Sequence, residues 1–365
     1  MSDESVYEKQ EKFAEYKNFE TKENCKKRKP LSGCFLFGCG GCFGGVVLFF
    51  LLIILPVMLI FGSSDFSSDF DIEVKTVPGY DRETSDSIVV IPVHGTIMYG
   101  KGNRSGVVTP ENFSAMMQKA GEDSNVRAVI ISIDSPGGEV NAADEIYRRI
   151  LAFREKTKRP VIALMRSMAT SGGYYIAAAC DQIIASDTTM TGSIGVIISS
   201  YNVKDLLDLL GVENEVYKSG EMKDMLNPAR ERTSEERKIV QEMVKECYIK
   251  FASIVSKSRK IPLEKIINGP IGDGRIYHGK KALSYGIIDK IGYLEDAVAL
   301  CESMTKSGKN SLKVIKYQKT PGLFDSILEE SSILKNGVNV NLNLPGKTPQ
   351  VELEPGRLYY LPAGL

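Results

Sequence analysis

Residues 165–196 read MRSMATSGGYYIAAACDQIIASDTTMTGSIGV, and this stretch decides the fold that we expect. The apolar run Pro160–Met165 predicts a strand, small residues then make a turn, and a segment of helical composition opens at Ser171. At such a junction the free N–H groups of the first helical turn and the helix dipole favour negative charge. Two explanations fit Ser171: it caps the helix, or it is a nucleophile that generates an oxyanion.

A second glycine turn, Ser135-Pro-Gly-Gly138, follows the apolar run Arg127–Ile133. Neighbouring parallel strands end at one edge of a sheet, where α/β proteins place their sites. We therefore expect the N–H groups of Gly138 and Gly172 to converge beside Ser171 as an oxyanion hole. Taken singly, each glycine pair is also typical of an ordinary turn.

Strand and helix patterns alternate along the chain at the spacing of βαβ units, which predicts an α/β domain with strands buried on both faces. Thr233-Ser-Glu-Glu236 has the pattern of a capping box before a long helix. We expect strands at 88–93, 127–133, 160–165, 182–185, 193–199 and 212–218, and helices at 109–120, 139–156, 203–210, 234–260, 262–267, 280–285 and 294–303.

A serine hydroxyl needs a base to act as a nucleophile. The chain has two histidines, His94 and His278, and neither lies among the signals of a Ser-His-Asp triad. A lysine is the alternative base, because desolvation disfavours its ammonium form. The candidates are Lys218 and Lys223, and the residues themselves leave the choice between them open.

Composition bounds the class of protein. A chain of 365 residues with 43% hydrophobic content can bury one main core, and its zero net charge gives no reason to expect a nucleic-acid partner. The seven cysteines, four of them within 25–42, do not form a disulfide framework. The pair Cys39-Gly-Gly-Cys42 lacks further ligands, so lipidated or merely small membrane-proximal residues explain Cys25, Cys34, Cys39 and Cys42 better. We expect no metal and no cofactor.

The front of the chain predicts a membrane anchor. Residues 31–64 carry no charge, basic residues precede them and acidic residues follow, so the N-terminus should stay in the cytoplasm. A cleaved signal peptide is the competing interpretation, but the apolar stretch is long and far from the N-terminus. The expected organisation is a charged cytoplasmic tail at 1–30, a transmembrane anchor at 31–64, a linker at 65–86, a catalytic domain at 87–305 and an extended tail at 306–365.

Five motifs in order resemble the signal peptide peptidase A family of membrane-anchored serine peptidases. They are SPGG at 135–138, SMATSGGYYIA at 167–177, TGSIGV at 191–196, KSGxxKD at 218–224 and GRIYxG at 274–279. The resemblance implies a Clp/crotonase-like fold, a repeated ββα superhelix behind an N-terminal transmembrane helix. It also implies a Ser/Lys dyad in a single-domain short form whose members assemble into rings.

By this resemblance Ser171 matches the nucleophile and Lys223 the general base, with Lys218 as the second candidate. Ser193 matches the serine that hydrogen-bonds the lysine, and Gly138 and Gly172 match the oxyanion-hole donors. Apart from the resemblance, we expect Met168, Tyr174 and Ile194 to line a substrate groove. We also expect Leu358–Leu365 to be a self-substrate that the enzyme trims or that lodges in its groove.

The implied function is a membrane-bound serine endopeptidase that degrades remnant signal peptides and other membrane-associated or unfolded peptides. It would act on the outer side of the bacterial cytoplasmic membrane as a homo-oligomer. The alternative is a non-proteolytic membrane-anchored scaffold of the same fold, because fold alone does not fix function. A serine-reactive probe distinguishes the two.

Overall fold

The computed structural model describes residues 72–100, 106–319 and 359–360. The expected cytoplasmic tail, the anchor at 31–64 and the four cysteines within it or before it lie outside the described residues. Among the helices in the described ranges, none combines the length and the hydropathy that crossing a bilayer requires.

A mixed sheet forms the centre of the domain, with the strand order β1-β12-β2-β5-β7-β8-β11. Its middle consists of β2 (Ser87–His94), β5 (Val126–Ser135) and β7 (Val161–Thr170), which run parallel to one another. These strands are rich in valine and isoleucine, residues that suit a pleated surface buried on both faces. The α/β class expected from the sequence is confirmed.

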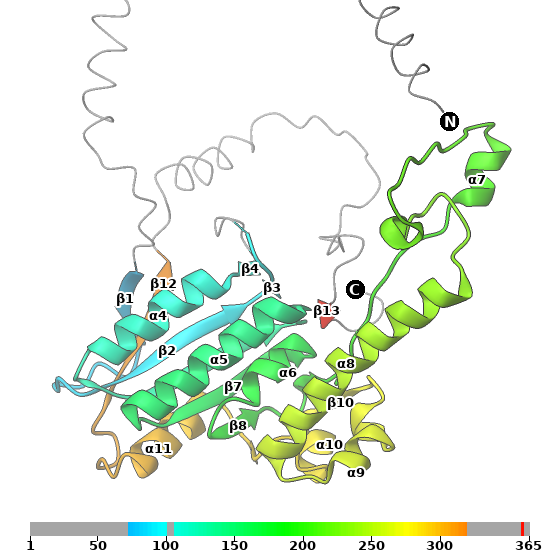
Figure 1. Cartoon of the computed structure of the whole chain (residues 1–365). Helices are drawn as coiled ribbons and strands as arrows, with labels where there is room; N and C mark the ends of the chain where they lie inside the picture. The colour runs from blue at the N-terminus through cyan, green and yellow to red at the C-terminus, as the bar shows by residue number, and fades with distance from the viewer. Residues whose placement is uncertain (1–71, 101–105, 320–358, 361–365) are drawn as a thin grey trace, which may run out of the picture. The chain divides into compact units, whose positions relative to one another are not determined.

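Helices cover both faces of this sheet (Figure 1). On one face, α4 (Pro110–Glu122), α5 (Val140–Thr157) and α8 (Ser234–Arg259) share a core with alternate strand residues such as Val129 and Ile131. On the other face, α11 (Leu294–Met304) packs against the intervening residues, among them Ile130. The alternation follows from the two-residue period of a strand.

The remaining elements are short. The strands β13-β6-β3-β4 form a second sheet, and β9 joins β7 and β10 in the first. Their bounds are β3 (Thr96–Ile97), β4 (Val107–Val108), β6 (Gly138–Glu139), β8 (Gln182–Ala185), β9 (Met190–Gly192), β10 (Ile276–His278), β11 (Lys290–Ile291), β13 (Tyr359–Tyr360), α6 (Gly172–Ala177), α7 (Lys204–Leu209), η2 (Glu221–Asp224), α9 (Leu263–Ile267), η3 (Pro270–Gly272) and α10 (Gly279–Ser284).

Two segments expected outside the catalytic domain take part in its sheet. β12 (Lys313–Lys319) lies in the expected tail and pairs in parallel with β2. β1 (Ile72–Thr76) lies in the expected linker and pairs with β12. The apolar residues Val314, Ile315 and Tyr317 are buried there, so burial against β2 explains why the segment is ordered as a strand.

Two expected strands are absent from the described part of the chain. Residues 212–218 have no regular structure and are exposed throughout, and 193–199 contains only an isolated bridge. Alternation of polar and apolar residues predicts a strand only where a neighbouring strand completes the hydrogen bonds. The segment 212–218 lacks such a neighbour.

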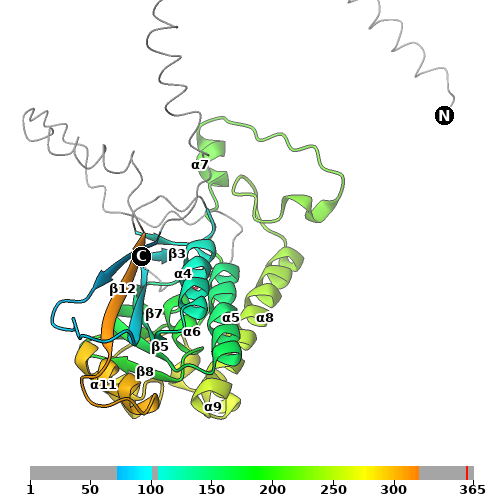
Figure 2. The same ribbon diagram turned by 90° about the vertical axis from the view of Figure 1, so that its left-hand side faces the viewer.

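Residues 200–233, which we call the arm, carry α7 and η2. Neither element contains a buried residue. Figures 1 and 2 both show α7 away from the sheet. The arm therefore presents both candidate lysines on a segment outside the core.

Candidate active site

Ser171 joins β7 to α6 in a strained conformation. Its φ is 53° and its ψ is −112°, a combination that residues with a side chain rarely adopt. Ser171 is fully buried, and its Oγ has no hydrogen-bond partner in the described part of the chain. Although Ser171 occupies the N-cap position, its side chain makes no capping hydrogen bond. Helix capping therefore does not explain this serine.

The turn 135–138 lies directly against the start of α6. The Thr170 hydroxyl donates to the carbonyl of Pro136 at 3.1 Å and ties the two turns together. A Cβ built on Gly172 would lie 3.1 Å from Gly137 Cα and 3.2 Å from Gly138 N. The structure thus brings the backbone amides of Gly138 and Gly172 together beside Ser171, at the shared edge of β5 and β7.

Gly138 lies at a close contact between two chain segments. It pairs with Ile97 of β3, and a Cβ at this position would lie 1.8 Å from the Ile97 carbonyl oxygen. No side chain fits there, so glycine is required by the approach of the backbone. On its other side β6 pairs with β13, in the register Tyr360↔Gly138.

Ser193 lies on the segment that follows β9, beside the nucleophile candidate. The Ser171 N–H donates to the Gly192 carbonyl at 2.8 Å, and Thr170 pairs with Gly192 in the sheet. Ser193 is 4% exposed, and its φ is 50°. Its N–H donates to the Arg275 carbonyl at 2.8 Å, which fixes the backbone in this conformation.

The two lysines differ in their surroundings. Lys218 Nζ forms an ion pair with Asp224 at 2.8 Å and donates to the Glu221 carbonyl at 3.0 Å. Lys223, on η2, is exposed, and its side chain has no hydrogen bond or ion pair with any described residue. Lys218 Nζ is therefore already engaged by a carboxylate and a carbonyl, whereas a general base needs its amine free to reach the serine. Neither lysine is bonded to Ser171 Oγ, so this structure does not bring the lysine and the serine together.

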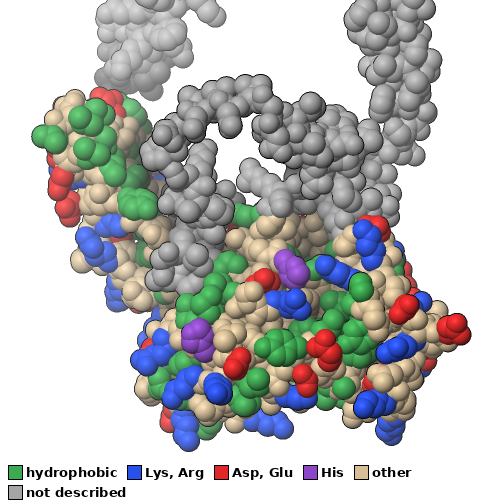
Figure 3. All heavy atoms as spheres, turned by 180° about the vertical axis from the view of Figure 1, so that it is seen from behind, with side chains coloured by type: hydrophobic (Ala, Val, Ile, Leu, Met, Phe, Trp, Pro, Cys, Tyr) green, Lys and Arg blue, Asp and Glu red, His purple; other side chains and the backbone are tan. Residues whose placement is uncertain are grey.

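Both histidines are engaged elsewhere. His94 Nε2 is 3.1 Å from Ser132 Oγ, and His278 Nδ1 is 3.1 Å from the Thr188 carbonyl oxygen. Both are visible on the face shown in Figure 3, which is the reverse of the view in Figure 1. Within the described ranges Ser171 has no histidine partner, which agrees with the weak sequence signal for a triad.

Two of the three residues expected to line the groove are fully buried in this structure, as Ser171 itself is. Tyr174 is fully buried, its hydroxyl donates to the Ile287 carbonyl at 2.7 Å, and burial raises the pKa of that hydroxyl. Ile194 is also fully buried, whereas Met168 is partly exposed. Short apolar segments next to a site face the core as readily as a substrate, and the sequence does not distinguish the two.

Sequence reasoning missed two residues, Thr170 beside the serine and Arg230 on the arm. Thr170 was visible within the motif, but its bond to Pro136 depends on the packing of two distant turns. Arg230 bridges Asp224 and Glu236, and no spacing rule connects those three positions. The capping box from Thr233 to Glu236 was the one available signal, and it is present in the structure.

The fold and the site define an α/β protein with a strained, buried serine beside paired glycine amides. The sequence matches the models of Peptidase family S49 over residues 153–307 and of the NfeD1b N-terminal domain over 88–207. The chain belongs to the signal peptide peptidase A family, which is peptidase family S49.

Several relatives agree with this placement. The "Putative signal peptide peptidase SppA" of Enterococcus faecium is 39% identical over 60% of this chain and 62% of that protein. The "Putative protease slr0021" of Synechocystis is 38% identical over 60% of this chain and 74% of that protein. The "Serine protease SPPA, chloroplastic" of Arabidopsis thaliana is 30% identical over 74% of this chain and 40% of that protein. The chain thus spans less than two thirds of the first and third of these relatives.

Two solved structures resemble this one at low identity. A Listeria monocytogenes ClpP1 mutant has 16% identity and a TM-score of 0.39, covering 57% of this chain and 94% of its own. A mutant of the 1510-N membrane-bound stomatin-specific protease has 19% identity and a TM-score of 0.41, covering 65% of this chain and 100% of its own.

Proposed function

We propose that the chain is a membrane-bound serine endopeptidase whose nucleophile is Ser171. The observation that carries the proposal is the buried Ser171 Oγ, which has no partner in the described ranges and lies next to the amides of Gly138 and Gly172. Burying a hydroxyl without a hydrogen bond costs about 1–3 kcal/mol, so a reactive role explains an arrangement that stability does not. Membership of a peptidase family supports the same assignment.

In the proposed reaction Lys223, as a neutral amine, takes the proton of Ser171 while Oγ attacks a peptide carbonyl. The N–H groups of Gly138 and Gly172 stabilise the oxyanion, and removal of one such donor typically costs about 100-fold or more in kcat. The lysine returns the proton to the leaving amine, and water then hydrolyses the acyl-enzyme. Ser193 orients the lysine by a hydrogen bond.

We assign the base to Lys223 rather than Lys218. Lys218 Nζ is already held by Asp224 at 2.8 Å and by the Glu221 carbonyl at 3.0 Å. Lys223 lies one residue before Asp224 on the same turn, and its side chain has no partner among the described residues. No described residue therefore competes with Ser171 for the side chain of Lys223.

The proposal includes the Clp/crotonase-like superhelix and a homo-oligomeric ring. The arm exposes large apolar side chains, among them Leu209 at 82% and Tyr217 at 91%. Covering them with a second copy would remove apolar area from water, which is favourable. Contact between copies would also pack the arm of one copy against a neighbouring copy. Such packing would bring Lys223 close to a serine.

We further propose that residues 31–64 anchor the protein in the bacterial cytoplasmic membrane, with the N-terminus in the cytoplasm and the catalytic domain on the outer side. Remnant signal peptides are the proposed substrates, together with other membrane-associated or unfolded peptides. The name of the Enterococcus faecium relative supports this substrate class. A cysteine-accessibility assay on cells tests the orientation, with Ser5→Cys and Ser307→Cys as the two reporter variants.

The decisive experiment measures peptide hydrolysis by the full-length protein in detergent. Ser171→Ala and Lys223→Ala should each reduce kcat at least about 1000-fold, as expected when an acting group of a dyad is lost. Lys218→Ala is the matched comparison and should lose far less activity than Lys223→Ala. A fluorophosphonate probe should label wild-type protein and not Ser171→Ala. Lack of any labelling or hydrolysis by the wild type would favour the scaffold instead.

The same assay should give an alkaline optimum, because a lysine base acts only when it is deprotonated. An activity plateau that persists down to about pH 5 would contradict a lysine base.

A further inference from the structure

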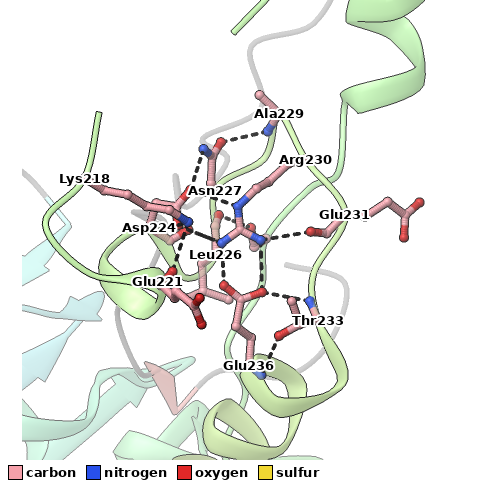
Figure 4. Close-up of polar contacts among 11 residues, drawn as sticks. Lys218, Glu221, Asp224, Leu226, Asn227, Ala229, Arg230, Glu231, Thr233 and Glu236 are labelled. Carbon is pink, nitrogen blue, oxygen red and sulfur yellow. Dashed lines mark hydrogen bonds and ion pairs between the residues drawn. The ribbon is translucent and has the colours of Figure 1, made fainter. Parts of the chain in front are cut away.

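Arg230 links the segment that carries Lys223 to the beginning of α8 (Figure 4). Its Nε donates to Asp224 Oδ2 at 2.8 Å, and its Nη2 donates to Asp224 Oδ1 at 2.8 Å. Its Nη1 donates to Glu236 Oε2 at 3.0 Å and to the Glu231 carbonyl at 2.9 Å, and Nη2 also bonds Glu236 Oε1. One guanidinium therefore makes a two-pronged contact with a carboxylate on each side.

The Glu236 side of this bridge is firmly attached to the domain. Glu236 is 2% exposed, and its carboxylate also accepts the Thr233 N–H at 2.8 Å as part of the capping box. Further along α8, Phe251 and Val255 are buried in the main core. The bridge thus connects a helix that packs on the sheet to η2, which has no buried residue of its own.

The Asp224 side of the bridge is the residue next to Lys223. Asp224 also accepts from Lys218 Nζ at 2.8 Å and from the Asn227 amide at 3.4 Å. Arg230 and Lys218 hold the pKa of the Asp224 carboxyl well below its usual range, so Asp224 is ionised at neutral pH. Its charge is balanced by two cations.

Charged groups of both signs lie on η2 with Lys223 or bond to its residues. Glu221 and Asp224 lie on η2, Lys218 and Arg230 flank them, and Glu236 lies on α8. The Glu231 carboxylate points away from this cluster in Figure 4. Removing Arg230 would leave Asp224 and Glu236 under-compensated, and extra negative charge near an amine favours its ammonium form.

We propose that Arg230 is a positioning residue for the general base Lys223. Arg230 clamps Asp224 to Glu236, which fixes the turn that bears Lys223, and it pairs with the carboxylate that adjoins Lys223 in the chain. This inference rests on the proposed function, in which Lys223 is the base.

The test compares pH profiles of kcat and KM for a peptide substrate with full-length protein. Arg230→Met should lower kcat at neutral pH about 10-fold or more with less than about 2-fold change in KM, because Arg230 does not touch substrate. It should also move the ascending limb of the profile to higher pH by about half a unit or more. Asp224→Asn removes negative charge and should move that limb to lower pH.

Arg230→Lys keeps the charge but loses the planar fork, so it should restore the pH profile while kcat stays reduced. Arg237→Met is the matched control, since Arg237 is an exposed arginine on the same helix as Glu236. It should behave as wild type. Circular dichroism shows whether Arg230→Met folds. If it does not, the inference is tested by the other two variants: the ascending limb of the pH profile should move to lower pH in Asp224→Asn and should match wild type in Arg230→Lys.

If Arg230 had only a structural role, Arg230→Met and Asp224→Asn would lower kcat without shifting the pH profile of either variant. This result would overturn the inference. Wild-type kinetics in Arg230→Met would also overturn it. These outcomes are distinct from failure of the proposed function, which would show as retained activity in Ser171→Ala or Lys223→Ala.

Discussion

Ser171 combines backbone strain with a buried hydroxyl that has no described partner. A residue outside the favoured φ/ψ regions costs about 1–3 kcal/mol, and it persists only where the surroundings hold it. Here the surroundings are visible: the Ser171 N–H donates to Gly192, and the Ser171 carbonyl accepts the Tyr175 N–H at 2.8 Å. Hydrogen bonds to the backbone on both sides of Ser171 thus fix where its Oγ lies.

Gly172 should be the most sensitive neighbour of this serine. A methyl group at Gly172 would lie 3.2 Å from Gly138 N, the other proposed oxyanion donor. Gly172→Ala should therefore reduce kcat about 10-fold or more, with Tm changed by only a few degrees. Steady-state kinetics and thermal unfolding check this.

Gly121→Ala is the control for the loss of a glycine. Gly121 lies in α4, and the added Cβ would meet only Phe153 ring atoms of α5 at 3.7 Å, an ordinary van der Waals contact. Activity should be unchanged and stability slightly higher, since alanine is the better helix former. Equal losses of kcat in the two variants would show that Gly172 has no special role.

At the scale of elements, β6 presents one side to β3 and the other to β13. Peptides commonly bind proteins by adding a strand to an exposed sheet edge. Because β13 pairs with β6 at Gly138, it occupies the edge along which a substrate strand would approach the proposed oxyanion hole. The pairing of Tyr359 and Tyr360 with β6 is the arrangement expected of a C-terminal segment that lodges in the groove.

A proline in β13 should weaken this competition. Tyr360→Pro removes a backbone N–H and disfavours the pairing. The KM for an added peptide should fall several-fold with little change in kcat, and Tyr360→Phe, which keeps the backbone, should match wild type. An unchanged KM in Tyr360→Pro would show that β13 does not compete with substrate.

The junction of the arm with α8 should make stability depend on acid pH. Arg230 and the Thr233 N–H lower the pKa of the Glu236 carboxyl from 4.5 to about 2. Since the folded value is the lower one, this stabilisation is complete above about pH 4.5 and is lost as the pH falls towards 2. Glu236→Gln should be less stable at neutral pH and should show a shallower acid dependence in urea unfolding. The exposed neighbour Glu235 offers the control Glu235→Gln, which should leave both quantities unchanged.

Local sequence patterns predict the elements that form from a continuous buried run or from short-range capping contacts. The buried runs of β2, β5 and β7, the cap at Thr109 and the capping box of α8 all follow from short-range chemistry, and the structure confirms them. The strand β12 was not predicted from the sequence, because its partner, β2, lies more than 200 residues earlier in the chain. Lysine placement also could not be predicted, because the arm is ordered by ion pairs among Asp224, Arg230 and Glu236 rather than by a core.

At the scale of the whole molecule, the described domain separates the serine from the lysine. Ser171 is part of the rigid sheet edge, whereas Lys223 belongs to an arm with exposed leucines and tyrosines. Exposed apolar side chains of this kind favour association between copies, and the proposed mechanism requires the serine and the lysine to meet. Assembly and activity should therefore be lost together.

A charge on the arm tests this coupling. Leu209→Glu places a carboxylate at a position that is 82% exposed, so it should not harm the isolated domain. Burying that charge against a second copy would be costly, so the oligomer should dissociate and kcat/KM should fall about 10-fold or more. Sedimentation velocity in detergent and peptide hydrolysis measure the two effects. Leu151→Glu, on the exposed side of α5, is the matched control and should change neither. A monomeric Leu209→Glu protein with full activity would show that one copy completes its own dyad, and the arm would then have to close onto the body of the same chain.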